Sequence, residues 1–457
     1  MFLFTRLKEK YLKFKEGFEP YDFKKLVYLG GAFFFIIGTY SVIRPLKTSV
    51  FLGLVGKEYM PYTKILTIFI LFPILFLYAK LVDKLKRHQV VYYFLGFYVV
   101  TIILTALVLI HPTIGLSNTQ TSPLRIFGWI FYLLIDLYSP LAVGTFWAFA
   151  NSISDTEYAK KNYGKIVAFS RISGIITPIL SWLLMEKVKI SYTKSIPIIL
   201  ITSAILLAFA TLCVAQIRKI PGYLLHGYEA VYIAEKHKGK EKKVGILEGL
   251  KLMVLQPYVF GIFSLVFIYE AISVILDYQM QVQMSVETNN AIGGMSAFMF
   301  LYTASFHVLG LIFSAFGTSA LLKKIGVYLC LFVMPISTIL LMLGLLTWPN
   351  LSTVFIIMVV LRALHYGFNA PVREILYIPT SKDIKFKSKA WIESFGRTGS
   401  KVSGSMVNAF YSGTAYLILT RINALFVIGL SVIWTVVTIL IGKKYDKTIK
   451  DGSTIGE

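Results

Sequence analysis

The chain has 457 residues, of which 56% are hydrophobic and 15% are charged, and its formal net charge is +23. A soluble protein of this length would carry about 25% charged residues. The composition therefore excludes an ordinary soluble protein, and the long continuous apolar blocks exclude a transmembrane β-barrel, whose strands alternate. The sequence predicts an all-α integral membrane protein.

The first 24 residues carry aromatic residues and leucines at helical spacing among charges, which predicts a short amphipathic helix on the membrane surface. About twelve apolar segments follow, each near the ~20 residues that span a bilayer. Their approximate ranges are 26–50, 62–82, 89–110, 125–150, 164–185, 195–217, 255–282, 292–321, 326–348, 351–371, 391–414 and 418–442.

The longest connection, 218–254, is strongly basic and divides the predicted spans six and six. We therefore expect a surface segment at 1–24, six-helix bundles at 25–217 and 255–442, a basic linker at 218–254, and a tail at 443–457. A central loop between two six-helix halves is the layout of the major facilitator fold. A monomer is expected for this fold.

Lysine and arginine are concentrated in alternate connections between the spans. The connections 83–88, 155–165, 218–251 and 373–389 are basic, whereas 111–124, 283–291 and 349–350 contain no Lys or Arg. Basic loops face the cytoplasm, so we expect a multi-pass protein of the cell (inner or plasma) membrane with both termini cytoplasmic. This orientation explains the positive charge better than nucleic-acid binding does, because no soluble basic domain is present.

Charges lie deep in a regular subset of the spans. They occur in the first, fourth, fifth, seventh, tenth and eleventh spans, and are absent from the interiors of the third, sixth, ninth and twelfth. A charge in hydrocarbon costs several kcal/mol, so such residues face a bundle interior or a water-filled cavity. The pattern indicates an outer layer around a polar path, as in a transporter.

Cations outnumber carboxylates at these deep positions. Arg44 and Lys47 share one helix face, where two like charges repel unless an anion visits or acidic residues elsewhere neutralise them. Both alternatives remain open. The further candidates for substrate binding are Asp136, Arg171, Tyr269, Glu270, Asp277, Arg362, His365, Asn369, Arg373, Arg397, Ser400 and Lys401. The excess of basic groups favours an anionic solute.

Catalytic signatures are missing from the sequence. It contains no phosphate-cradling glycine-rich loop, no nucleophile elbow and no His/Cys metal cluster. The two cysteines, Cys213 and Cys330, lie in separate apolar segments without metal-ligand spacing. We expect no enzyme, no cofactor and no metal.

Four sequence motifs resemble those of the ATP/ADP translocase family of intracellular bacteria and plastids. They are IRPLKTS at 43–49, FWAFANSISDTEYAKKNYG at 146–164, YGFNAPVREILYIP at 366–379 and GRTGSKVSGS at 396–405. The resemblance implies a nucleotide transporter of the major facilitator type, with Lys47 as a lysine that contacts substrate. It also implies Asp136 and Asp277 in place of family glutamates, and either Ser400 or Lys401 in place of a lysine.

The resemblance implies alternating-access transport of ATP, ADP or a related nucleotide, with exchange as the expected mode. The alternative is a proton-coupled facilitator-type carrier for another organic anion or phosphorylated metabolite. Asp136 or Asp277 would then carry the proton.

Overall fold

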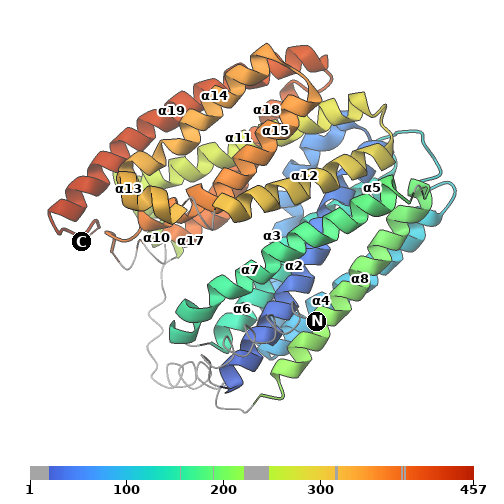
Figure 1. The fold of residues 1–457 in the computed structure, drawn as a ribbon, viewed down its shortest axis with the longest axis horizontal. Coiled ribbons are helices and arrows are strands. Elements are labelled where there is room, and N and C mark those ends of the chain that lie inside the picture. Colours follow the sequence, from blue (N-terminus) through green and yellow to red (C-terminus); the bar gives the residue numbers. More distant parts are fainter. Residues whose placement is uncertain are drawn as a thin grey trace, which may run out of the picture. The chain divides into compact units, whose positions relative to one another are not determined.

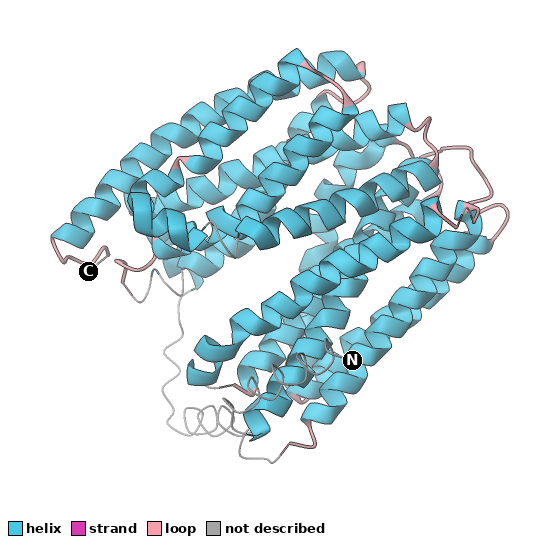
Figure 2. Cartoon of the chain, in the orientation of Figure 1, coloured by secondary structure: helices cyan, strands magenta, loops and turns pink. Residues whose placement is uncertain are grey.

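A computed structural model describes residues 20–154, 156–188, 190–220, 246–313, 318–381, 384 and 388–456. Within these ranges the chain is almost entirely helical, and the β structure is limited to an isolated bridge between Thr380 and Ile455 (Figure 2). The predicted surface helix at 1–24 falls outside the described residues up to residue 19, as does most of the predicted linker at 218–254.

Helices follow one another along the whole described chain (Figure 1). The first set is α2 (Pro20–Leu54), the 3₁₀ turn η1 (Lys57–Tyr59), α3 (Met60–Lys84), α4 (Arg87–Ile110), α5 (Ile126–Asp136), the π-helical turn η2 (Ser139–Val143), α6 (Gly144–Ser152), α7 (Thr156–Glu186) and α8 (Tyr192–Ile217). The second set begins with α10 (Ile246–Leu255), α11 (Pro257–Glu287), α12 (Ile292–Ile312), α13 (Thr318–Leu331), α14 (Val333–Thr347) and α15 (Leu351–Leu364). It continues with the π-helical turn η4 (His365–Asn369), α16 (Ala370–Ile375), α17 (Lys389–Trp391), the π-helical turn η6 (Ile392–Gly396), α18 (Arg397–Phe410) and α19 (Tyr416–Lys450).

Each predicted span coincides with helical structure. Among the described residues, nine helices are long and apolar enough to cross a membrane, and a bent pair, α13 with α14, brings the number to ten. The remaining predicted spans, 62–82 and 391–414, coincide with α3 and with η6 followed by α18. The protein is therefore an all-α membrane protein, and the count of twelve spans stays a prediction.

The chain forms two compact units. Unit 1 consists of Met1–Lys47, Phe72–Asn118 and Leu134–Glu241, and unit 2 of Thr48–Leu71, Thr119–Leu133 and Lys242–Glu457. The predicted division at 218–254 stays a prediction.

In unit 1, α2 packs closely against α7 because small side chains meet at the crossing. A Cβ atom added to Gly38 would lie 2.4 Å from Ser173 Oγ. Ser173 Oγ donates to the Phe34 carbonyl at 2.5 Å and Thr177 Oγ1 donates to the Gly38 carbonyl at 3.0 Å. These hydrogen bonds hold α2, which carries the first deep cations, at a fixed position.

In unit 2, α11 is the most buried candidate membrane span, because 78% of its apolar stretch is buried inside the protein. It packs against α15, α18 and α19, and Figure 1 shows α14 running alongside α19 in the same unit. At the crossing with α18, a Cβ atom on Gly404 would lie 2.8 Å from the Ala271 carbonyl oxygen. Asn408 Nδ2 donates to the Val274 carbonyl at 3.1 Å. The close crossing places the charges of α18 next to those of α11.

Candidate functional site

In unit 1, a buried ion pair joins the first deep lysine to the acidic residue of the fourth predicted span. The Lys47 ammonium contacts the Asp136 carboxylate, with 5% and 15% of the two side chains exposed. The pair links α2 to α5, although 89 residues separate the two positions. Asp136, whose role the sequence left open, is therefore a partner of Lys47.

Two stacked tyrosines lie close in sequence to the members of this pair. Tyr40 stacks on Tyr138 with ring centroids 5.6 Å apart and planes 5° from parallel, and the Arg44 guanidinium lies 5.9 Å from the Tyr40 ring. The Tyr138 hydroxyl donates to the Ile36 carbonyl at 2.9 Å. The ring of Tyr138 is thus fixed by the main chain of α2, and Tyr40 extends the aromatic surface toward Arg44.

In unit 2, a second ion pair has the reverse polarity. The Arg362 guanidinium of α15 contacts the Asp277 carboxylate of α11, with 8% and 25% of the side chains exposed. Arg362 Nε also donates to the Tyr302 hydroxyl at 3.3 Å. Tyr302 was not among the predicted site residues, because an uncharged tyrosine in a separate span gives no signal in the sequence.

The two pairs occupy matching places along the chain. In unit 1 the predicted first span supplies the cation and the fourth supplies the carboxylate; in unit 2 the seventh supplies the carboxylate and the tenth supplies the cation. In both cases a π-helical turn begins three residues after the charge on the fourth or tenth span, at Ser139 and at His365.

Proline accounts for both π-helical turns in physical terms. Pro140 lies within η2, and Pro371 lies two residues after η4. A proline has no N–H to donate to the carbonyl four residues earlier, so the regular hydrogen-bond ladder is interrupted there. Single π-helical turns of this kind are frequent at functional sites.

The rings of His365 and Tyr269 stack on each other in the protein interior. Their ring centroids lie 3.5 Å apart with planes 2° from parallel, and both side chains are buried. The His365 Nδ1 atom lies 3.3 Å from Asn369 Nδ2, which is also buried. The structure thus brings these three predicted residues together, and His365 begins the π-helical turn that directly follows α15, which carries Arg362.

A chain of alternating charges, here called the α11–α18 charge cluster, contains five residues: Arg373, Glu393, Arg397, Glu270 and Lys401. Arg373 Nη2 lies 3.4 Å from Glu393 Oε1, and Arg397 Nη2 lies 2.6 Å from Glu393 Oε2. Glu270 lies 3.7 Å from Arg397 Nε and 3.9 Å from Lys401 Nζ. Three cations face two carboxylates, so the cluster carries an excess positive charge.

Exposure differs along the α11–α18 charge cluster. The side chain of Arg373 is 3% exposed, whereas those of Arg397 and Lys401 are 36% and 45% exposed. The open end of the cluster is therefore at Lys401, where the contact with Glu270 is also the longest.

Ser400 and Lys401 have different surroundings. Ser400 is buried, and its hydroxyl donates to the Gly396 carbonyl within the same helical segment. Its donor is therefore used by the main chain, and Lys401 is the better ligand candidate. Arg171 is half-buried on α7, in unit 1. Among the described residues no group of three or more His, Cys, Asp or Glu side chains is placed to hold a metal ion.

The sequence matches the profile of the TLC ATP/ADP transporter family over residues 6–445. The chain belongs to this family. One relative, ADP,ATP carrier protein 3 of Rickettsia bellii (strain RML369-C), is 23% identical, and the match covers 91% of this chain and 93% of that protein.

Solved transporters share the fold of this TLC family member. The inward-facing bacterial homologue of the iron transporter ferroportin has a TM-score of 0.62 at 13% identity, covering 91% of this chain and 99% of that one. The inward-open xylose transporter XylE from E. coli has a TM-score of 0.53 at 13% identity, covering 88% and 94%. The fold is therefore major facilitator-like, as predicted.

Proposed function

We propose that this protein exchanges nucleotides such as ATP and ADP across a membrane by alternating access. Membership of the TLC family supports this function over a proton-coupled carrier for another organic anion. In the major facilitator fold, substrates bind near the membrane midplane and access alternates between the two sides. The proposal includes a multi-pass, monomeric protein of the cell membrane with both termini cytoplasmic.

The observation that carries the proposal is that each unit contains a buried ion pair, with the order of cation and carboxylate along the chain reversed between the two units. Lys47 and Arg362 each lie almost wholly buried in contact with a carboxylate. Burying two charges requires desolvation of both. Removing one partner of a buried pair then lowers the stability of the folded protein by about 3–5 kcal/mol, because the other charge is left buried without compensation. A phosphate can replace the carboxylate as the counter-ion of such a cation, so the cation never lacks an anionic partner. Each unit therefore contains a cation held in place to which a nucleotide phosphate could bind.

The α11–α18 charge cluster supplies further phosphate contacts in this proposal. Arg397 and Lys401 are partly exposed and lie 3.7 and 3.9 Å from Glu270, beyond the usual hydrogen-bond range. Phosphate oxygens can therefore bind Lys401 without first breaking a close pair, whereas Arg397 keeps its 2.6 Å contact with Glu393. Tyr40, whose ring lies 5.9 Å from the Arg44 guanidinium, is an aromatic candidate for contact with the base.

Transport by purified protein in liposomes tests the function. Vesicles preloaded with unlabelled ADP should accumulate labelled ATP faster than empty vesicles, because exchange requires an internal partner. A sugar phosphate should neither be taken up nor compete. Failure of correctly inserted protein to transport any nucleotide would reject the proposal, and uptake that follows a proton gradient without internal nucleotide would favour the alternative carrier.

The roles of single residues are tested by neutralisation. Lys47→Gln should lower nucleotide uptake by about 100-fold or more, since a charge-assisted contact is worth about 1.5–3 kcal/mol and the variant also takes the ammonium charge away from the mostly buried Asp136 carboxylate. The matched control is Lys187→Gln, at a lysine on the turn after α7. Equal uptake by Lys47→Gln and the control would exclude Lys47 from the substrate site.

A further inference from the structure

A groove lies on unit 2 at the bend between α13 and α14. It has a volume of about 550 Å³ and is lined by Tyr328, Leu329, Phe332, Val333, Ile336 and Ser337. Five of these side chains are hydrophobic, and those of Leu329 and Ile336 are 52% and 47% exposed. An exposed apolar groove in a candidate membrane span faces lipid rather than water.

The groove exists because the span is broken. Its two helical parts meet at an angle of 58°, with Phe332 between them. Pro335 follows in the first turn of α14 and has no N–H for the Leu331 carbonyl, which ends the helical ladder there. The bend leaves a notch that a straight helix would fill, so the notch is fixed by the sequence.

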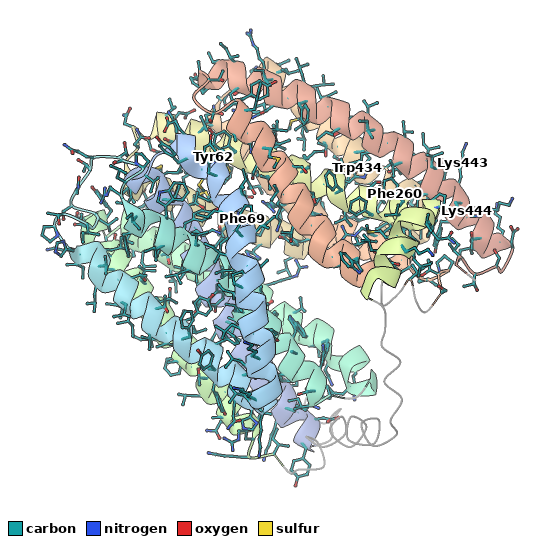
Figure 3. All side chains as sticks on the ribbon, turned by 180° about the vertical axis from the view of Figure 1, so that it is seen from behind. Tyr62, Phe69, Phe260, Trp434, Lys443 and Lys444 are labelled. Carbon is teal, nitrogen blue, oxygen red and sulfur yellow. The ribbon has the colours of Figure 1, made fainter. Side chains whose placement is uncertain are left out.

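Lysines lie at one end of this groove. The Tyr328 ring packs so closely on Gly442 of α19 that a Cβ atom there would lie 1.9 Å from the ring. Lys443 and Lys444 follow directly and are exposed, and both project from the C-terminal part of α19 in Figure 3. On α13, Lys324 lies four residues before Tyr328 and is also exposed.

These lysines are available for an external anion. Within the described part of the chain, none of the three makes an ion pair or hydrogen bond with another side chain. Lysines at the ends of membrane spans extend their charge to the headgroup level while their stems follow the apolar surface. The cations and the groove therefore match the two parts of a phospholipid: the lysines could bind the phosphate at the headgroup level, and the apolar groove could hold an acyl chain.

We propose that this groove binds an anionic phospholipid, with one acyl chain along the α13–α14 bend and the phosphate near Lys443, Lys444 and Lys324. Charge complementarity decides for an anionic lipid over a neutral one, because basic pockets beside membrane helices attract anionic headgroups. This inference is independent of the proposed transport function.

Native mass spectrometry and thermal unfolding of the full-length protein in neutral detergent test the proposal. The probes are dioleoyl-phosphatidylglycerol, dioleoyl-phosphatidylcholine and glycerophosphoglycerol, which is the headgroup without chains. Phosphatidylglycerol should be retained and should raise the unfolding temperature. The neutral lipid and the free headgroup should do neither.

Variants separate the two parts of the site. Lys443→Gln with Lys444→Gln should weaken phosphatidylglycerol binding by about 25-fold, or about fivefold per lysine. The matched control, Lys447→Gln with Lys450→Gln, removes the same charge further along α19 and should change binding by less than about twofold. Leu329→Trp, at an exposed groove position, should block the acyl chain and abolish retention.

Several results would overturn the proposal. Equal binding of the neutral lipid would show an unselective apolar surface, and binding of the free headgroup would show a phosphate site without a role for the groove. Equal losses in the two double variants would indicate diffuse electrostatic attraction. Unchanged binding in Leu329→Trp would exclude the groove as the acyl-chain site.

Discussion

Removing the charge of Arg362 and removing the charge of Asp277 should destabilise the protein to different extents. Asp277→Asn leaves an arginine that is 8% exposed with Tyr302 as its remaining acceptor, whereas Arg362→Gln leaves a carboxylate that is 25% exposed. Removing one member of a buried pair costs about 3–5 kcal/mol. We expect Asp277→Asn to lie near the upper value and Arg362→Gln near the lower one, because the more buried orphan loses more solvation.

The double variant, Asp277→Asn with Arg362→Gln, tests whether the loss of stability comes from the buried unpaired charge. With both charges replaced by amides, no buried charge is left unpaired, and the loss of stability should fall to about 1–2 kcal/mol. Reversible unfolding of purified protein in mixed detergent gives the three free energies and hence the coupling between the sites. The control is the more exposed pair Lys389–Glu374, 2.5 Å apart, whose coupling should be below about 1 kcal/mol. A double variant as unstable as Asp277→Asn alone would refute the argument.

Two further predictions concern α18 and α19. Lys401→Gln should weaken nucleotide binding about tenfold, with a reduced dependence on salt, whereas Ser400→Ala should leave binding unchanged; ligand-induced thermal shifts at two ionic strengths measure both, and equal effects would contradict the assignment. Gly442→Ala should destabilise by about 1–3 kcal/mol, because the new Cβ would lie 1.9 Å from a tyrosine ring. Gly429→Ala in the same helix, which meets nothing within 4 Å, should stabilise by about 0.5–1 kcal/mol; the opposite order would show that the crossing is loosely packed.

The helical spans could be predicted from the sequence because apolar length alone specifies a membrane helix. The major facilitator-like fold followed from the positions of the deep charges and from motif resemblance. The first prediction depends on a property of each stretch of chain by itself, and the second on a pattern of charges and motifs that can be read along the chain without knowing which spans touch. Glu393 and Arg397, four residues apart on one segment, carry a local signal of this kind in their spacing, and the structure contains their ion pair.

Pairing between distant spans could not be predicted. Lys47 has Asp136 as its partner across 89 positions, and Arg362 has Asp277 across 85. Several carboxylates were equally plausible by charge, and the choice depends on helix rotation, which packing at small residues such as Gly404 decides. The π-helical turns were also missed, although Pro140 and Pro371 offered a local signal for them.

The charge balance of the site suggests an order of binding. In the two buried pairs each cation already has a carboxylate partner. Binding of a phosphate there gains only the difference in interaction free energy between the phosphate and the carboxylate that it replaces. In the α11–α18 charge cluster three cations share two carboxylates, and the contact of Lys401 with Glu270 is 3.9 Å long. Under the proposed function, an arriving phosphate would therefore gain most at Lys401, where only this long contact must be given up. In the same proposal, binding at Arg362 would follow, because it requires Asp277 to give up its partner, and only a ligand already held nearby can compete with that carboxylate.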